Sequence, residues 1–176
     1  TPPSRIGTPY SVAGTSPQGI PPFPLKQAII PIGQTNQRPG YTMIPDRYVQ
    51  HDTGNRNVGA NAVMHKNYLH QGAPDNYGRS QLLSYHFTVD DKEAWQMIPV
   101  NEVSWHGGDS DGPCNMRGIS CELCINADIN EPESRNNAEI LAAEVMNALG
   151  LQILEKHGDC CARQGNPSGC HSECPA

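Results

Sequence analysis

The sequence predicts an α/β domain with a single mixed β-sheet flanked by helices. Apolar and polar residues alternate over 82–89 and again over 119–126, which is the period-two pattern of a half-buried strand. Apolar residues instead recur every three to four positions over 58–69 and 134–149, as on one face of a helix. Strands and helices that alternate in this way along one chain are typical of a sheet covered by helices.

The chain divides into an arm and one folded domain. Its 176 residues fall within the usual size of a single domain with one core. Residues 1–24 contain seven prolines together with Gly, Ser and Thr, a composition that favours extended, solvated backbone. We therefore expect a Pro-rich arm or linker at 1–24 and a folded domain at 25–176 that ends in a Cys-rich tail.

The first part of the domain is predicted to hold two strands and a helix. Apolar residues at 28–32 suggest a short first strand, and the Arg-Pro-Gly turn at 38–40 leads to a second strand over 47–51. His51 therefore ends a strand. The helical spacing over 58–69 predicts the helix that follows.

The second part is predicted to hold a β-hairpin, one further strand and the longest helix. The strand over 82–89 meets a polar turn at 90–93, and 94–98 fits its hairpin partner. After a glycine-bearing loop at 109–113, the alternation over 119–126 places Glu122 on the face opposite the apolar residues.

The long helix is predicted to begin near Ser134 and to end near Gly150. A serine side chain accepts a hydrogen bond from the first turn of a helix, and glycine is a frequent terminator. Between them runs an apolar stripe of Ile, Leu, Val and Ala, which makes this the clearest helix of the chain.

Charge and hydropathy exclude two classes of partner. The formal net charge is −6 with only 12 Lys and Arg, so no broad positive field attracts nucleic acid. No apolar run approaches the roughly 20 residues that cross a bilayer, and the amino terminus lacks the regions of a signal peptide. We expect a soluble protein that binds neither nucleic acid nor membrane.

Seven cysteines favour an extracellular or cell-wall setting, because cytosolic thiols stay reduced. In that setting one thiolate would hold a metal and the other six could form up to three disulfide bonds. The rival interpretation is a reduced cluster of free thiols. Cys160, Cys161, Cys170 and Cys174 are too crowded for a separate zinc finger with regular paired spacing.

The histidines are the first candidates for a metal site. A hydrolytic zinc site usually takes three protein ligands from His, Cys or a carboxylate and keeps a position for water. None of the histidines forms the short helical His-Glu pair of the common metalloproteases. Any site must therefore be assembled from distant segments, among His51, His65, His70, His86, His106, His157 and His171.

Several short phrases in a fixed order carry a resemblance to a known family. They are Arg38-Pro39-Gly40-Tyr41, His51-Asp52-Thr53-Gly54-Asn55, Ser84-Tyr85-His86-Phe87-Thr88-Val89-Asp90-Asp91, Ser104-Trp105-His106-Gly107-Gly108-Asp109, Gly118-Ile119-Ser120-Cys121-Glu122 and Cys174-Pro175. In order and spacing the chain resembles the type-2 N-acetylmuramoyl-L-alanine amidases. That group includes phage endolysins, bacterial autolysins, T7-type lysozymes and animal peptidoglycan recognition proteins. The resemblance covers residues 25 to about 157.

The resemblance implies a T7-lysozyme-like fold and a zinc-dependent hydrolase. The implied substrate is peptidoglycan, cut at the amide between N-acetylmuramic acid and L-alanine, by a monomer outside the cell, in the cell wall or released from a phage-infected cell. A phage lysin and a bacterial autolysin share this domain, so the sequence does not separate them.

The resemblance also implies the metal ligands. His51 matches the first zinc ligand, while a histidine after the long helix and a cysteine before proline suggest His157 and Cys174. The segment between these two is longer than in relatives, which leaves His171 as an alternative to His157 and Cys170 as an alternative to Cys174.

The catalytic roles are implied in the same way. Glu122 matches the glutamate that acts as general base on zinc-bound water, and Tyr85 matches a tyrosine that the T7-type members use near the carbonyl. The positions that match the substrate groove are His86, His106, Thr53 and Asn55.

Two other functions remain open at this point. Recognition proteins with this fold lose the cysteine ligand and bind peptidoglycan without cutting it, so a non-catalytic muropeptide-binding module is the alternative to the enzyme. A disulfide-rich secreted scaffold is the third interpretation, which depends only on the number of cysteines.

Overall fold

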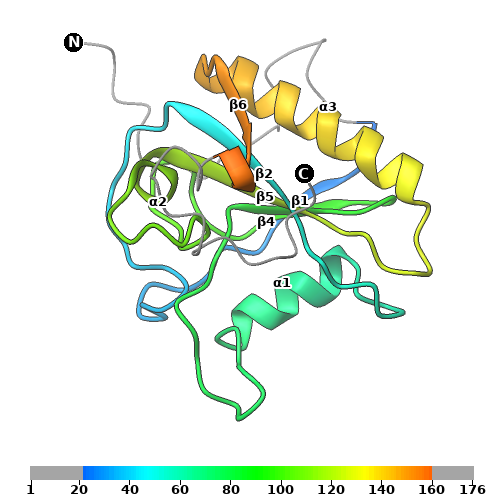
Figure 1. Ribbon diagram of the computed structural model, residues 1–176, viewed down its shortest axis with the longest axis horizontal. Helices are drawn as coiled ribbons and strands as arrows, with labels where there is room; N and C mark the ends of the chain where they lie inside the picture. Colours follow the sequence, from blue (N-terminus) through cyan, green and yellow to red (C-terminus); the bar gives the residue numbers. More distant parts are fainter. Residues whose placement is uncertain (1–21, 160–176) are drawn as a thin grey trace.

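The computed structural model describes residues 22–159, which form a six-stranded mixed sheet with helices on both faces (Figure 1). The elements in chain order are β1 (Leu25–Gln27), β2 (Arg47–Asp52), α1 (Ala62–His70), β3 (Phe87–Val89), β4 (Ala94–Gln96), α2 (Pro113–Arg117), β5 (Gly118–Leu123), α3 (Glu131–Leu149) and β6 (Ile153–Lys156). The predicted fold class, an α/β domain with a single mixed sheet flanked by helices, is confirmed.

The strands lie in the order β1-β4-β3-β5-β2-β6. Only β3 and β4 pair antiparallel, as the predicted hairpin, and the other neighbours are parallel. Because β2, β5 and β6 run in the same direction, their carboxyl ends meet at one edge of the sheet. Side chains that follow these three strands are therefore brought together.

The helix α3 covers one face of the sheet and forms the main core with it. Its apolar side packs against β5, β2 and β3, and Leu141 and Val145 are completely buried there. The helix begins earlier than predicted, since Asn130 caps it and Ser134 lies one turn inside, where its hydroxyl donates to the carbonyl of Cys124. Gly150 ends it in the left-handed conformation, with φ of 69°.

The helix α1 covers the opposite face, against β3 and β4. It is shorter than predicted because Asn61 caps it by accepting a hydrogen bond from the amide of Met64. Val58, which was expected inside the helix, is 78% exposed. Leu69 at the other end is buried and joins a second core cluster with Ile30.

Two predicted strands are displaced or shortened. The first strand is β1 at Leu25–Gln27 rather than 28–32, although Ala28 and Ile30 still donate to carbonyls of the β4 side. Pro31 has no amide hydrogen with which to extend the pairing. In the predicted strand over 82–89 only the part within β3 is regular.

Two elements were not predicted at all. The short helix α2 lies beside β5, and the strand β6 pairs with β2 at an edge of the sheet. β6 is only four residues long, and just one of them, Glu155, is buried. Its sequence therefore lacks the alternation that reveals a half-buried strand.

The described residues also bear on the predicted boundary between the arm and the folded domain, and on two of the cysteines. Phe23 is buried in the main core, so the folded part includes at least this residue of the predicted arm. Cys121 and Cys124 are free, buried thiols of the sheet region. The expectation that six cysteines could form up to three bridges is reduced to two at most, because five of the seven cysteines remain once Cys121 and Cys124 are thiols. The tail from residue 160 lies outside the described residues.

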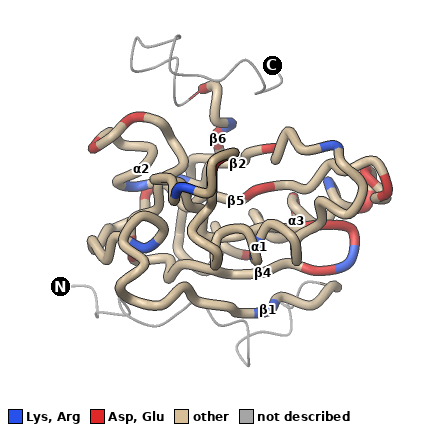
Figure 2. The backbone as a smooth tube through the Cα atoms, turned by 90° about the horizontal axis from the view of Figure 1, so that it is seen from below, with Lys and Arg blue, Asp and Glu red and all other residues tan. Residues whose placement is uncertain are grey.

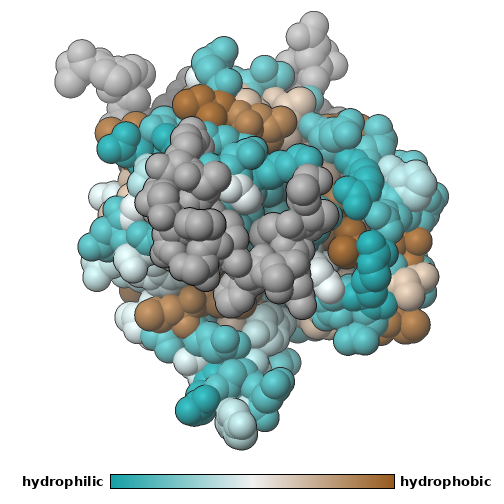
Figure 3. Space-filling view, viewed as in Figure 1, coloured by the Kyte–Doolittle hydropathy of each residue, from teal (hydrophilic) through white to brown (hydrophobic). Residues whose placement is uncertain are grey.

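Charged groups are spread over the described surface. Figure 2 shows Lys and Arg scattered along the chain, with acidic residues near the amino-terminal end of α3, in agreement with the negative net charge. On the face drawn in Figure 3, hydrophilic residues surround separate apolar patches. None of the helices between residues 22 and 159 is long and apolar enough to cross a membrane.

Candidate active site

The register of three parallel strands brings His51, Glu122 and His157 to one edge of the sheet. His51 in β2 lies directly opposite Glu122 in β5. Gln50 lies opposite Lys156, the last residue of β6, so that the next residue, His157, comes beside His51. Residues far apart in the sequence are thus neighbours because of strand pairing.

These side chains are in contact distance and largely buried. His51 Nδ1 lies 3.0 Å from His157 Nδ1 and 3.9 Å from Glu122 Oε1. The relative exposures are 7% for His51, 8% for His157 and 14% for the Glu122 side chain. Two imidazoles and one carboxyl group therefore converge on a single place.

Burial sets the protonation of this cluster. It lowers the pKa of His51 well below the ordinary value, and the neighbouring His106 and His157 add to the shift. Burial also raises the pKa of Glu122 to about 8, with a further contribution from the negative charge of Asp52. The cluster thus contains a neutral imidazole and a carboxyl group that is a stronger base than usual.

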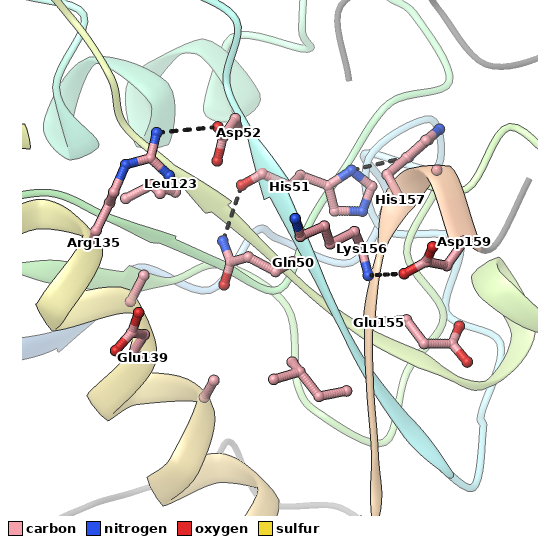
Figure 4. Close-up of a pocket in the computed structure, with 14 residues that line it drawn as sticks. Gln50, His51, Asp52, Leu123, Arg135, Glu139, Glu155, Lys156, His157 and Asp159 are labelled. Atoms are coloured by element: carbon pink, nitrogen blue, oxygen red, sulfur yellow. Dashed lines mark hydrogen bonds and ion pairs between the residues drawn. The ribbon is translucent and has the colours of Figure 1, made fainter. Parts of the chain in front are cut away.

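The cluster lies between two cavities. A cavity of about 630 Å³ extends from His51 and His157 along α3, where Arg135 forms an ion pair with Asp52 at 3.6 Å (Figure 4). A second cavity of about 470 Å³ extends from His157 past Trp105. His157 therefore lines both cavities. Nothing in the sequence predicted the Asp52 and Arg135 pair, which joins two distant segments.

His106 belongs to this cluster, although it was expected to bind substrate. Its Nδ1 lies 3.0 Å from His51 Nε2, on the side of His51 away from His157. Only 6% of His106 is exposed. The structure thus places His106 behind a predicted metal ligand.

His86 and Tyr85 are buried and hydrogen-bonded within the fold. His86 is completely buried, with Nε2 donating to the carbonyl of Glu102 and Nδ1 beside the hydroxyls of Ser104 and Ser120. These contacts fix the ring within the fold, and the predicted contact of His86 with substrate stays a prediction. The hydroxyl of Tyr85 donates to the carbonyl of His65 in α1, although Glu122 acts on it electrostatically.

Thr53 and Asn55 follow β2 at the edge of the site. Thr53 continues the strand pairing by donating its amide to the carbonyl of Leu123, and its hydroxyl oxygen is buried without a partner among residues 22–159. Asn55 accepts a hydrogen bond from the amide of Asn57. Their predicted role in substrate binding stays a prediction.

The donor atoms fit a zinc ion in part. Two nitrogens that bind one tetrahedral zinc at about 2.0 Å lie about 3.3 Å apart, close to the observed 3.0 Å between the Nδ1 atoms of His51 and His157. Neutral imidazole is the form that binds metal. Within residues 22–159, however, no three His, Cys, Asp or Glu side chains form a complete metal site.

The remaining candidates for a third ligand are Cys174, Cys170 and His171, and all three lie outside the described residues.

Comparison with known proteins agrees with this geometry. The family model described as N-acetylmuramoyl-L-alanine amidase matches residues 41–175, which include the strands that carry His51 and Glu122. The chain belongs to this family. The expected family and fold are thereby confirmed.

The chain is also similar in sequence to individual members of this amidase family. The chain is 42% identical over 127 residues to the N-acetylmuramoyl-L-alanine amidase XlyA of Bacillus subtilis, covering 72% of this chain and 40% of XlyA. It is 37% identical over 130 residues to the amidase CwlH of the same organism, covering 73% of this chain and 49% of CwlH. The chain thus spans less than half the length of these two relatives.

Solved structures of the family superpose on the fold. The catalytic domain of XlyA aligns with a TM-score of 0.73 and 35% identity, covering 86% of this chain and 89% of that one. PlyL aligns with a TM-score of 0.67 and 25% identity, covering 80% and 90%.

Proposed function

We propose that the chain is a zinc-dependent peptidoglycan hydrolase that cleaves the amide between N-acetylmuramic acid and L-alanine. The observation that carries this proposal is the convergence of His51, His157 and Glu122 at the ends of three parallel strands. Membership of the amidase family gives the reaction class. The proposed partner is cell-wall peptidoglycan, met by a monomer outside the cell or after release from an infected one.

His51 and His157 are the proposed ligands from the described residues, and Cys174 is the proposed third, with His171 and Cys170 as alternatives. Bound zinc acts as a Lewis acid that polarises a carbonyl oxygen and makes water more acidic. The distance of 3.0 Å between the two Nδ1 atoms supports this role for the two histidines.

Glu122 is the proposed general base. Its carboxyl group lies 3.9 Å from His51 Nδ1, and burial raises its pKa to about 8. A carboxylate with a raised pKa accepts a proton from water more readily than an ordinary glutamate does. The same group then donates this proton to the amine of the leaving L-alanine, so that the amide is hydrolysed without net change at Glu122.

The experiment is digestion of purified cell wall by the wild-type protein and by Glu122→Gln. We expect the wild type to release new amino-terminal L-alanine and the variant to release almost none. Release of reducing sugar instead would indicate a glycosidase. Equal release of L-alanine by both proteins would contradict the role of Glu122.

The same experiment separates the enzyme from a binding module. A muropeptide-binding protein without catalysis would sediment with the wall and leave the number of amino-terminal L-alanine residues unchanged. Bound zinc after extensive dialysis supports the enzyme.

A further inference from the structure

His51 contacts a different partner with each of its ring nitrogens. Nδ1 faces His157 and Glu122, whereas Nε2 lies 3.0 Å from Nδ1 of His106. The rings of His51 and His106 stand at 87°, so that the Nδ1 atom of His106 is presented to the edge of the His51 ring. A neutral imidazole carries one proton, and the partners decide which nitrogen holds it.

The positions of the other groups decide between the two possible directions of this contact. Nδ1 of His51 faces His157 and Glu122, and a neutral imidazole that binds a metal through Nδ1 carries its proton on Nε2. Nδ1 of His106, 3.0 Å away, would then accept the hydrogen bond from His51 Nε2.

The backbone around His106 is fixed by side chains of the loop and of α2. The Oδ1 atom of Asn115 accepts hydrogen bonds from the amides of His106 and Gly107, at 2.8 and 2.7 Å. Asp109 in turn accepts from the amides of Cys114 and Asn115. His106 therefore has little freedom to turn away from His51.

We propose that His106 is a positioning residue that holds the proton of His51 on Nε2 and so leaves His51 Nδ1 free to bind the metal. This inference rests on the proposed zinc-dependent function. A histidine that binds a metal commonly donates its other ring N–H to a fixed acceptor, and loss of that acceptor costs roughly 10- to 100-fold in metal affinity.

A direct role of His106 in substrate binding has different consequences. His106 also lines the cavity that passes Trp105. If it only touched substrate, its replacement would raise KM and leave zinc affinity unchanged. Zinc affinity and the tautomer of His51 are therefore the decisive measurements.

The test compares His106→Leu, which removes the acceptor, with His106→Asn, whose Oδ1 lies near the former position of Nδ1. His65→Leu is the matched control, since His65 is a partly buried histidine of α1 away from His51. Zinc affinity is measured by competition with a chelator. We expect His106→Leu to weaken zinc binding roughly 10- to 100-fold, with most of the affinity restored in His106→Asn and unchanged in the control.

The tautomer is measured in the metal-free proteins by nitrogen NMR of the histidine side chains. In the wild type we expect the single ring proton of His51 to lie on Nε2. In His106→Leu we expect a mixture of the two neutral tautomers, with the proton on Nε2 in some molecules and on Nδ1 in others. A proton on Nδ1 in the wild type would overturn the inference, and this result needs no variant to fold. Wild-type zinc affinity in His106→Leu would also overturn it.

Failure of the proposed function gives a different result. A wild-type protein that binds no zinc, or that releases no L-alanine from cell wall, contradicts the proposed function. The NMR measurement on metal-free protein still decides whether His106 sets the tautomer of His51.

Discussion

Glu122 shows how a single residue acquires its chemistry from its position. On an exposed strand a glutamate is an ordinary surface acid, whereas here its carboxyl group is largely buried beside His51 and has a pKa of about 8. The nearby Asp52 contributes to this shift because a second negative charge disfavours ionisation.

Replacement of Glu122 by glutamine should separate catalysis from metal binding. Glutamine has nearly the same shape but accepts no proton from water, so we expect the rate of L-alanine release to fall roughly 100- to 10,000-fold. Zinc affinity should stay close to that of the wild type. The exposed Glu133 in α3 provides the control, since Glu133→Gln should release L-alanine at the wild-type rate. A comparable loss in both variants would contradict the prediction.

Tyr85 gives a second test at this scale. Its hydroxyl donates to the carbonyl of His65, and its ring packs with Ile30 and Leu69. We expect Tyr85→Phe to lower the free energy of unfolding by about 0.5–1.5 kcal/mol, the usual contribution of one hydrogen bond. Activity per folded molecule should not change. A large loss of activity at full stability would instead support the catalytic role that the resemblance implied.

At the scale of elements, the close approach of α2 and β5 places His106 behind His51. Gly118 begins β5, and a Cβ atom there would lie 2.4 Å from the carbonyl oxygen of Cys114 and 3.2 Å from Cε1 of His106. Only glycine fits this contact without displacing backbone.

We therefore expect Gly118→Ala to lower the free energy of unfolding by about 1–3 kcal/mol through overpacking, and to weaken zinc binding by shifting His106. Gly59→Ala is a useful comparison. Gly59 has φ of 80° but open space around it, so this variant should lose stability through backbone strain alone and keep its zinc affinity. Denaturant unfolding and chelator competition measure both effects. Unchanged stability in Gly118→Ala would contradict this packing.

The elements that the sequence predicted well are those with a clear period. The strand of Glu122 alternates in sequence and α3 has a continuous apolar stripe, so the existence of both follows from local pattern. β6 is too short and too exposed to show a pattern. The residues 82–86 alternate, but Ser84 and His86 bond to separate segments rather than to one neighbouring strand.

The residues of the candidate site could be predicted from the sequence, but their contacts could not. Resemblance identified His51, Glu122 and His157, but their contact depends on strand register, which is a tertiary property. The support of His106 by Asn115 follows from a loop conformation that no periodic pattern encodes. Burial of His86 likewise results from packing between segments.

At the scale of the whole molecule, buried neutral histidines couple stability to pH. Burial lowers the pKa of His65 and of His86 to about 4. In the unfolded chain a histidine takes up a proton near pH 6.5, whereas the same two rings in the folded protein stay neutral until about pH 4. Stability is therefore retained above pH 6.5 and is lost as the pH falls toward 4.

We expect the free energy of unfolding of the metal-free protein to fall between pH 7 and pH 5, by up to about 2 kcal/mol for each of the two histidines. His65→Leu should show a smaller fall, because one of the buried histidines is gone. Denaturant unfolding at both pH values measures the difference. A wild-type stability that is constant or rises toward pH 5 would contradict buried neutral histidines.

We propose above all that zinc held by His51 and His157 makes this chain a cell-wall amidase. The most direct measurement is zinc titration of the metal-free protein, with amino-terminal L-alanine released from purified wall as the signal. We predict that release begins with added zinc and saturates at one zinc ion per chain. Full release by the metal-free protein in excess chelator would contradict the claim.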